Sequence, residues 1–173
     1  MIQTNILATQ NIIEAALEAN VEKVIFTSSD KAVNPTNVMG ASKLMCEKLI
    51  TAANTLTYGN KTIFASVRFG NVIGSRGSVV PVFMKQIKAR GPVTVTDKRM
   101  TRFIMTIEEA TNLVLKTSLL ARGGEVFITK MPVMRIMDLA EVMIDILAPK
   151  YGYAKETIKT MGHVRRHPRR RHW

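Results

Sequence analysis

Helical and strand-like segments alternate along this chain, and that alternation limits its fold more than any other feature. Apolar residues recur at helical spacing in five segments, and short runs of β-branched and aromatic residues stand between them. A regular exchange of the two periodicities is typical of βαβ units, which build a largely parallel sheet. No internal repeat and no low-complexity linker occurs before residue 160. We therefore predict an α/β fold with helices over residues 4–19, 38–54, 78–90, 106–121 and 135–148 and strands over residues 21–29, 61–74, 92–97 and 125–130.

The start of the chain differs from that of a complete nucleotide-binding fold. A doubly wound nucleotide-binding domain normally begins with a strand, a glycine-rich turn and a helix whose N-terminus holds the pyrophosphate. Here residues 4–19 already have a helical pattern, and no G-x-G-x-x-G motif occurs in residues 1–30. We expect Asn20 to end this first helix.

Length and cysteine content narrow the class of protein. The 173 residues are enough for one domain with a substantial core, and the 46% hydrophobic content is ordinary for a globular chain. No apolar run approaches the roughly 20 residues that span a bilayer, and the N-terminus lacks the basic-then-apolar order of a signal peptide. Cys46 is the single cysteine, which excludes an intrachain disulfide framework and favours a reducing, cytoplasmic location.

The net charge of +12 is concentrated at the C-terminal end. Five of the 25 basic residues are arginines within residues 163–173, which also hold all three histidines. The remainder is moderately basic, as expected for a protein that handles phosphates or other anions. A nucleic-acid interface would show a basic stripe with interleaved aromatic residues, and none occurs before this tail. We expect no nucleic-acid binding by the folded part; the alternative is a module that binds nucleic acid or an acidic surface through the tail.

The segment SSDKAVNPTNVMGASK gathers polar groups at the end of the first predicted strand. Ligands of open α/β sheets bind outside the carboxyl ends of the strands, which is where Ser29, Asp30 and Lys31 stand. Met39 and Lys43 follow four residues apart on the next helix, so both lie on one helix face. A hydroxyl, a carboxylate and two amines together indicate acid–base chemistry. The alternative is a solvated turn with an ordinary Asp–Lys pair.

A second segment, RFGNVIGSRGS, follows the next predicted strand. Its glycines permit close backbone approach of a ligand, and its polar side chains suit contact with an anion. The alternative is an ordinary glycine loop. The candidate residues are Asn71, Gly74, Arg76, Gly77 and Ser78.

A third segment, TVTDKRMTRF, places Arg99 and Arg102 near a strand end. A guanidinium fork fits the geometry of a phosphate. Two surface arginines without a ligand are the alternative.

Together these segments carry a family resemblance. SSDKAVNPTNVMGASK, VRFGNVIGSRGSVVPVF and PVTVTDKRMTRFIMTIEEA, in this order and spacing, closely resemble the nucleotide-sugar 4,6-dehydratases and epimerases of polysaccharide biosynthesis, in the extended short-chain dehydrogenase/reductase superfamily. The resemblance runs from about Thr4 to Tyr153 and corresponds to the later part of such an enzyme. It implies the C-terminal part of a Rossmann-like doubly wound parallel sheet plus a small substrate-binding α/β portion.

The resemblance assigns catalytic roles within the first segment. Ser29 takes the hydroxyl position of a Ser/Thr–Tyr–Lys triad, and Lys43 is the lysine that holds the nicotinamide ribose. Asp30 and Lys31 correspond to the acid and base of the dehydratases. Met39 stands at the tyrosine position, so Asp30, or Lys43 through a water, must accept the proton of the sugar 4-hydroxyl. Met39 is expected to form an apolar wall of the sugar pocket; the alternative is core filler in a nonfunctional remnant.

The resemblance also implies the ligands. The expected cofactor is NAD, with NADP as the alternative, and its expected contacts are Thr27, Lys43 and Val72. The expected substrate is a UDP-sugar, UDP-N-acetylglucosamine by family, and no metal site is assigned. The expected contacts of the UDP-sugar are Asn71, Ser78 and Arg102.

The implied reaction removes water from the sugar. Hydride leaves C4 for the cofactor, Lys31 removes the C5 proton that the new ketone has made acidic, and Asp30 protonates the departing C6 hydroxyl. Hydride then returns to C6, which regenerates the cofactor. The alternative is a 4-epimerase of the same family, in which hydride returns to C4; the Asp30–Lys31 pair favours the dehydratase.

We expect three parts along the chain. Residues 1–75 correspond to the later half of a NAD-binding domain, without its first βαβαβ unit and glycine-rich loop, and residues 76–160 to a substrate-binding portion. Residues 161–173 are expected to be a disordered basic tail or the product of a shifted reading frame. We expect a homo-oligomer for the full-length protein and no activity from these 173 residues alone.

Overall fold

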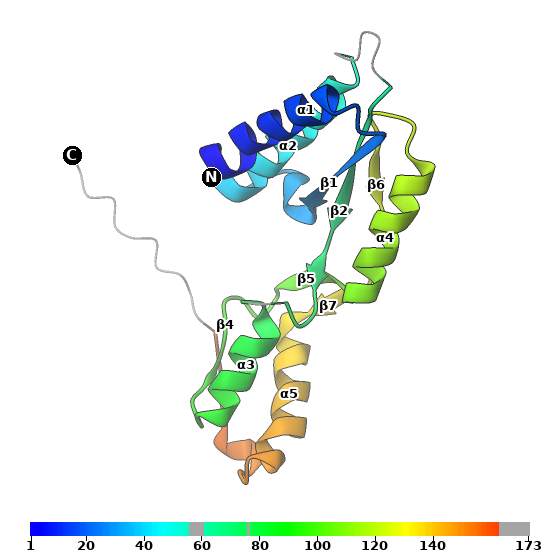
Figure 1. Cartoon of the computed structure of the whole chain (residues 1–173). Coiled ribbons are helices and arrows are strands. Elements are labelled where there is room, and N and C mark those ends of the chain that lie inside the picture. The colour runs from blue at the N-terminus through cyan, green and yellow to red at the C-terminus, as the bar shows by residue number, and fades with distance from the viewer. Residues whose placement is uncertain (56–60, 76, 163–173) are drawn as a thin grey trace, which may run out of the picture. The chain divides into compact units, whose positions relative to one another are not determined.

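The computed structural model describes residues 1–55, 61–75 and 77–162, and the chain divides into two compact units (Figure 1). Unit 1 combines Met1–Gly70 with Met105–Met131, and unit 2 combines Asn71–Ile104 with Pro132–Trp173. Each unit consists of two separate stretches of the chain and has a hydrophobic core of its own.

A parallel three-stranded sheet in the order β1-β2-β6 forms the centre of unit 1. β1 (Lys23–Ser29) and β2 (Ile63–Phe69) pair over their whole length, and β6 (Val126–Ile128) pairs with the second half of β2. The middle of β2 is a continuous apolar and small-residue run that is buried, as in parallel sheets that are covered on both faces. The parallel sheet predicted from the alternation of periodicities is confirmed.

Helices cover both faces of this sheet (Figure 1). On one face lie α1 (Ala8–Glu18), which follows a π-helical turn η1 (Ile2–Leu7), and α2 (Val38–Ala53). On the other face lies α4 (Ile107–Leu120), which contacts β1 and β2. The buried side chains beneath α1 and α2 are Ile13, Ala16, Ile50, Ala53 and Phe64.

Short polar signals determine where the helices of unit 1 begin and end. Asn20 follows α1 with φ +52°, a left-handed conformation that asparagine tolerates, and this confirms the predicted helix end. The Asn37 side chain accepts a hydrogen bond from the Gly40 N–H at 2.9 Å and caps α2. Thr106 and Glu109 form a reciprocal capping box at the start of α4.

Unit 2 packs two helices and several short strands around the second core. α3 (Val79–Lys88) and α5 (Ile136–Lys150) lie side by side (Figure 1). Two small sheets, β3-β5-β7 and a parallel β4-β8 pair, complete the unit. The strands of these two sheets are β3 (Asn71–Val72), β4 (Val93–Val95), β5 (Thr101–Met105), β7 (Val133–Arg135) and β8 (Thr160–Gly162). A 3₁₀ turn, η3 (Lys155–Thr157), precedes β8.

The predicted helices and strands are all present, with one division and several additions. The strand predicted over residues 61–74 is divided into β2 and β3, which belong to different sheets and different units. The sequence pattern did not predict β5, β7 and β8. β7 and β8 have three residues each and, unlike the three-residue strands β4 and β6, do not lie in a longer run of β-branched and aromatic residues.

The division into units differs from the predicted one in three respects. A boundary was expected at residue 75, and the chain first passes from unit 1 to unit 2 after Gly70. Residues 105–131, however, return to unit 1, because β6 pairs with β2 and α4 covers the sheet. Residues 161 and 162 belong to β8 and not to a disordered tail, while residues 163–173 lie outside the described part of the chain.

In the part of the chain that the structure describes, no helix is long and apolar enough to cross a membrane.

Candidate active site

The polar cluster predicted at the end of β1 is present. Ser29 is the last residue of the strand, and Asp30 and Lys31 begin a 3₁₀ turn, η2 (Asp30–Ala32). One carboxylate oxygen, Asp30 Oδ1, accepts hydrogen bonds from Ser29 Oγ at 2.9 Å and from Lys31 Nζ at 3.0 Å. The Asp30 side chain is 17% exposed and that of Lys31 36%, so this ion pair is partly shielded from water.

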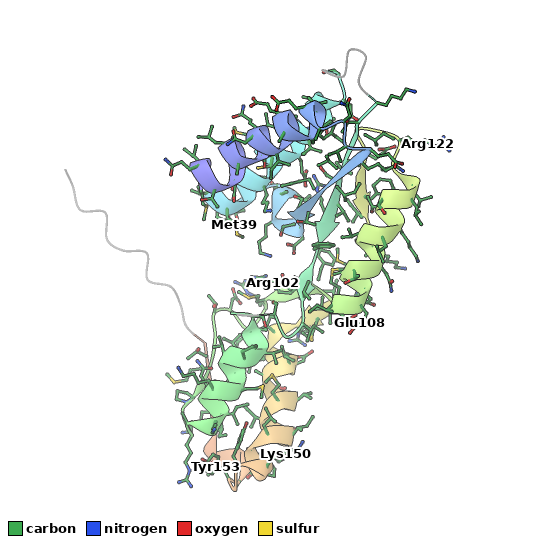
Figure 2. The ribbon with its side chains drawn as sticks, viewed as in Figure 1. Met39, Arg102, Glu108, Arg122, Lys150 and Tyr153 are labelled. Atoms are coloured by element: carbon green, nitrogen blue, oxygen red, sulfur yellow. The ribbon has the colours of Figure 1, made fainter. Side chains whose placement is uncertain are left out.

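A glycine allows α2 to begin directly beside this cluster. Gly40 is buried in the first turn of α2, and a Cβ at this position would overlap the backbone carbonyl of Lys31. The glycine therefore lets the helix approach η2 more closely than any other residue would. Met39, labelled in Figure 2, precedes it and is 38% exposed, so it does not fill the core of unit 1.

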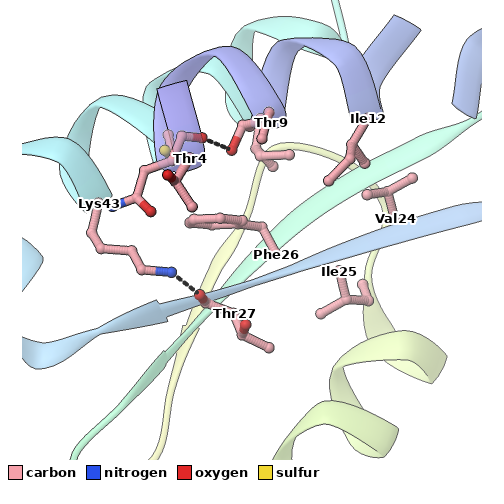
Figure 3. A pocket seen from close by; sticks show the side chains of 12 residues that line it. Thr4, Thr9, Ile12, Val24, Ile25, Phe26, Thr27 and Lys43 are labelled. Atoms are coloured by element: carbon pink, nitrogen blue, oxygen red, sulfur yellow. Dashed lines mark hydrogen bonds between the residues drawn. The ribbon is translucent and has the colours of Figure 1, made fainter. Parts of the chain in front are cut away.

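Lys43 extends from α2 to β1, where two neutral groups of the strand receive its ammonium (Figure 3). Lys43 Nζ donates a hydrogen bond to the backbone carbonyl of Thr27 at 3.0 Å. It also lies 4.7 Å from the centroid of the Phe26 ring, within the range of a cation–π contact. Thr27, which accepts the hydrogen bond of Lys43, precedes Ser28 by one residue and Ser29 by two on β1, the strand at whose end the acid–base cluster stands.

Phe26, Thr27 and Lys43 line a pocket of about 310 Å³ within unit 1, and Ser29, Asp30 and Lys31 are not among its lining residues. Its volume is at the lower end of small-molecule sites, so it suits a group of the size of a nucleoside better than a whole dinucleotide. Polar groups at the edge of the pocket are hydrogen-bonded to one another. Asn5 Nδ2 donates to Ser42 Oγ at 2.8 Å, and Thr9 Oγ1 donates to the Asn5 backbone carbonyl at 2.6 Å. The lining residues are Thr4, Asn5, Ala8, Thr9, Ile12, Val24, Ile25, Phe26, Thr27, Lys43, Cys46 and Ile50 (Figure 3).

A buried ion pair joins α2 to the sheet one helical turn after Lys43. Arg68 on β2 donates from Nε to Glu47 Oε1 at 2.9 Å and from its terminal nitrogen to Glu47 Oε2 at 2.7 Å. The Glu47 side chain is 3% exposed. Burial raises the pKa of Glu47, but the hydrogen bonds and charge of Arg68 outweigh it, and the net pKa of Glu47 is lowered. Arg68 stands opposite Ser28 in the sheet, so the pair fixes α2 at the level of the acid–base cluster.

The predicted substrate contacts gather separately, in unit 2. Asn71, Ser78 and Arg102 line one pocket of about 30 Å³, and Val72, which was expected to contact the cofactor, lines it with them. Such a volume holds little more than one water-sized group. Among the described residues the buried Ser78 Oγ has no hydrogen-bond partner, which suits a polar group of a ligand.

The two arginines of the third segment differ. Arg102, labelled in Figure 2, donates to its neighbouring backbone carbonyl, Thr101 O, at 2.8 Å and lines the small pocket. Arg99 is 90% exposed and is held by Asp97 at 2.8 Å, so it is the surface arginine that the alternative described. Its guanidinium lowers the pKa of Asp97 to about 2. Arg76, another predicted anion contact, lies outside the described residues.

The candidate residues therefore form two groups, each within one unit. Thr27, Ser29, Asp30, Lys31, Met39 and Lys43 belong to unit 1, and Asn71, Val72, Ser78 and Arg102 belong to unit 2. Sequence reasoning missed Asn5, Phe26 and the Glu47–Arg68 pair. A charged Arg68 inside a buried strand was the one signal that could have revealed this pair, because such a charge requires a partner.

Comparison with known proteins identifies the family. A family model described as polysaccharide biosynthesis protein matches residues 1–167. The chain belongs to this family.

Relatives in the family include enzymes that act on nucleotide sugars. The chain is 58% identical over 158 residues to an uncharacterized membrane protein of Methanocaldococcus jannaschii, a match that covers 91% of this chain and 47% of that protein. It is 46% identical to the UDP-N-acetylglucosamine 4,6-dehydratase (inverting) of Campylobacter jejuni, with 86% and 45% covered. It is 43% identical to the UDP-glucose 4-epimerase of Rickettsia canadensis, with 86% and 44% covered.

Solved structures have the same fold. Pen from Bacillus thuringiensis matches with a TM-score of 0.89 and 50% identity, over 94% of this chain and 49% of that one. DesIV, a dTDP-glucose 4,6-dehydratase from Streptomyces venezuelae solved with NAD and TYD bound, matches with a TM-score of 0.77 and 19% identity, over 95% and 55%. The predicted Rossmann-like α/β class is thereby confirmed, and this chain spans about half the length of these family relatives.

Proposed function

We propose that this chain carries the acid–base half of an NAD-dependent 4,6-dehydratase that removes water from a UDP-N-acetylhexosamine, with UDP-N-acetylglucosamine as its substrate. The observation that carries the proposal is the Asp30–Lys31 pair, joined at 3.0 Å at the carboxyl end of β1. A base and an acid are the two groups that an elimination of water needs.

The pocket of unit 1 fits one end of NAD. Lys43 offers its ammonium there, and one donor is already directed at the Thr27 carbonyl, which leaves further donors for ribose hydroxyls. Bound NAD would supply the acceptor that takes hydride from the sugar and gives it back. NADP is the alternative cofactor. Val72 is a further proposed cofactor contact, although it lines the pocket of unit 2.

A proton shift along one hydrogen bond would prepare the acid and the base. Asp30 and Lys31 form an ion pair, and a carboxylate and an ammonium are the wrong forms for catalysis. A sugar that fills the site excludes water, and desolvation disfavours both charged forms. Transfer of the proton from Lys31 Nζ to Asp30 Oδ1, over 3.0 Å, yields an amine that can take the C5 proton and an acid that can protonate the C6 hydroxyl.

Ser29 would orient the acid and the sugar. Its hydroxyl donates to Asp30 Oδ1 at 2.9 Å, and it can also hydrogen-bond the developing 4-ketone. Met39, exposed on the same face of α2 as Lys43, would form an apolar wall against the sugar. Since a thioether cannot take a proton and Asp30 already carries one after the transfer from Lys31, the 4-hydroxyl proton would pass to solvent through a water held by Lys43.

The pocket of unit 2 would bind the substrate's diphosphate and sugar. Arg102 supplies a positive charge, and Ser78 stands at the N-terminus of α3, where the helix dipole favours an anion. The unpartnered Ser78 hydroxyl and the Asn71 side chain would provide hydrogen bonds. Because this pocket is small, it would hold one group of the substrate at a time.

A 4-epimerase is the second candidate, supported by the 43% identity to the Rickettsia canadensis enzyme. An epimerase also moves hydride at C4, but it needs no acid for the C6 hydroxyl. The partly shielded Asp30–Lys31 pair therefore favours the dehydratase.

A chimeric protein tests the proposal. The part of the Bacillus thuringiensis relative that this chain does not cover would be joined to this chain and incubated with NAD and UDP-N-acetylglucosamine. Mass spectrometry should show a product lighter by one water. A product of unchanged mass with inverted C4 would establish the epimerase instead, and an unchanged substrate in a folded chimera would contradict both.

A further inference from the structure

Lys43 is held by groups that carry no charge. Its ammonium contacts the Thr27 carbonyl at 3.0 Å and the Phe26 ring at 4.7 Å (Figure 3). Among the described residues no carboxylate lies within ion-pair distance of Lys43, in contrast to Lys31, which is paired with Asp30. The position of the Lys43 ammonium therefore depends on a carbonyl and on the face of an aromatic ring.

We propose that Phe26 is a positioning residue for Lys43, holding the ammonium at the pocket through a cation–π contact. The inference deepens the proposed function and rests on it, because Lys43 is the residue proposed to hold the cofactor's ribose. Phe26 itself would take no part in the chemistry.

The ring is suited to this role because it is fixed on its other side. Phe26 lies in the middle of β1 and packs against the core beneath α1 and α2. Because the Phe26 ring is packed, its position is fixed. Its electron-rich face therefore attracts the Lys43 ammonium to one place. A flexible lysine side chain loses rotamer freedom when it is held there, and the contact offsets part of that loss.

A neutral partner leaves the lysine available to a ligand. An ammonium has three donors, and the Thr27 carbonyl accepts one of them. The aromatic face attracts the positive charge without accepting a conventional hydrogen bond from the ammonium. A carboxylate would accept hydrogen bonds from one or two of the N–H donors and so compete with a hydroxyl ligand. Phe26 and Lys43 both line the pocket, so the remaining donors stand where a ligand would enter.

The competing explanation is that Phe26 only fills space between the helices and the sheet. Three substitutions separate the two roles. Phe26→Leu keeps an apolar side chain but removes the ring face, Phe26→Tyr keeps the ring face, and a series of fluorinated phenylalanines at position 26 weakens the ring quadrupole with little change of shape. Phe103→Leu, at a ring 45% exposed in unit 2, is the matched control.

The first test measures the contact in this chain as it exists. In an NMR spectrum the Hε protons of Lys43 should be shifted upfield by the ring current of Phe26. The shift should vanish in Phe26→Leu and remain in Phe26→Tyr and Phe103→Leu. Lys43 signals that are the same in Phe26→Leu as in the unaltered chain would overturn the inference.

The second test measures the consequence in the chimera with the Bacillus thuringiensis part. Phe26→Leu should lower kcat/KM for NAD roughly two- to tenfold, the range expected from a cation–π contact. Phe26→Tyr should stay within about twofold, and the fluorinated series should lose activity in step with the number of fluorines.

The two failures are distinguishable. Equal losses in Phe26→Leu and Phe26→Tyr, or no trend along the fluorinated series, would show that the ring only packs and would overturn the positioning role. An inactive chimera with the native Phe26 would overturn the proposed function and the positioning role together. Thermal unfolding of each variant identifies losses that arise from misfolding.

Discussion

At the residue scale, Asp30 and Lys31 differ from an ordinary surface ion pair in their hydrogen bonds and their position at a strand end. Asp30 Oδ1 receives hydrogen bonds from two neighbours, Ser29 at 2.9 Å and Lys31 at 3.0 Å, at the end of a parallel strand. An exposed Asp–Lys pair contributes little to stability, typically below about 1 kcal/mol. The pair therefore contributes little to folding, and a catalytic role for it is part of the proposed function.

Loss of either member of the pair should stop the reaction without unfolding the protein. In the chimera, Asp30→Asn keeps the shape of the side chain but cannot donate a proton as a carboxylic acid, and Lys31→Ala removes the base. We expect each to lower turnover of UDP-N-acetylglucosamine by roughly 10²–10⁴-fold, the typical contribution of a positioned acid or base. A product assay gives the rate, and a loss of less than tenfold in both variants would remove the pair from the mechanism.

Met39 should tolerate an apolar replacement. If Met39 is a wall of the sugar pocket, Met39→Leu conserves volume and should retain most of the turnover. The same assay applies, with Asp30→Asn as the reference for a catalytic loss. Should Met39→Leu prove as damaging as Asp30→Asn, the side chain has a specific role that an apolar wall does not explain.

At this scale the sequence predicted that the polar residues of unit 1 lie close together, but not the contacts that support them. Ser29, Asp30 and Lys31 meet because consecutive residues at a strand end share an environment, and Met39 and Lys43 share a face by helix geometry. The Phe26–Lys43 contact joins residues 17 positions apart, 43 − 26, and depends on how α2 packs on β1. No local pattern encodes that packing.

At the element scale, the Glu47–Arg68 pair connects α2 to β2 through a bidentate contact, in which Glu47 is almost completely buried and Arg68 is partly buried. Glu47→Leu would leave the Arg68 charge without its partner and should lower the free energy of unfolding by about 3–5 kcal/mol. The double variant Glu47→Leu with Arg68→Leu removes both charges and should be more stable than the single variant. Urea unfolding followed by circular dichroism measures both; a double variant less stable than Glu47→Leu would contradict this account.

The same pair predicts a pH dependence. The pKa of Glu47 in the folded protein is lowered from its ordinary value of 4.5, so the unfolded chain binds the proton more readily than the folded one. The stabilisation is complete above about pH 4.5 and is lost as the pH falls through the lower folded pKa. Urea midpoints between pH 7 and pH 3 should fall less steeply in the double variant than in the unaltered chain.

The close approach of α2 to η2 requires glycine at position 40. An alanine at this position would place a methyl group against the Lys31 carbonyl, which is backbone and cannot rotate away. We expect Gly40→Ala to separate the helix from the catalytic turn and to lower turnover in the chimera more than tenfold, since a small misplacement of reacting groups is costly. Gly91→Ala is the control, because its Cβ would meet only the Gln86 carbonyl at 3.8 Å. Equal activity of the two variants would show that the approach of α2 has no functional role.

Helices with a long periodic pattern were predictable, and so were β4 and β6, which lie in β-branched runs, whereas β5, β7 and β8 were not. The amphipathic helices over residues 107–120 and 136–150 follow directly from apolar spacing. β3 and β7 have two and three residues and exist only because other strands of unit 2 pair with them. Their position is therefore a property of the tertiary structure.

At the scale of the whole molecule, two units each hold one group of candidate residues. The sequence predicted a boundary near the passage from β2 to β3 but not the return of residues 105–131 to the first unit, since that return is decided by the pairing of β6 with β2. Order along the chain indicates which elements exist, whereas pairing between distant strands decides which unit they join.

These 173 residues alone should bind NAD weakly or not at all. Strong binding of the pyrophosphate in this fold depends on backbone N–H groups of a glycine-rich turn at a helix N-terminus, and residues 1–30 contain no such motif. The pocket of about 310 Å³ offers room for one end of the cofactor only. Calorimetric titration of the monodisperse chain with NAD measures the affinity, and binding in the micromolar range would show that the cofactor site lies elsewhere in the chain.

The central claim is that Lys31 removes and restores a proton at C5 of the sugar while Asp30 releases water from C6. The most direct measurement is the reaction of the chimera with UDP-N-acetylglucosamine in deuterium oxide. Removal of the C5 proton and its later return from solvent predict a dehydrated product with one deuterium at C5, seen by proton NMR and by a mass one unit higher than that of the product formed in ordinary water. Lys31→Ala should form no such product. A dehydrated product that retains hydrogen at C5, or a C4-inverted sugar without deuterium, would contradict the account.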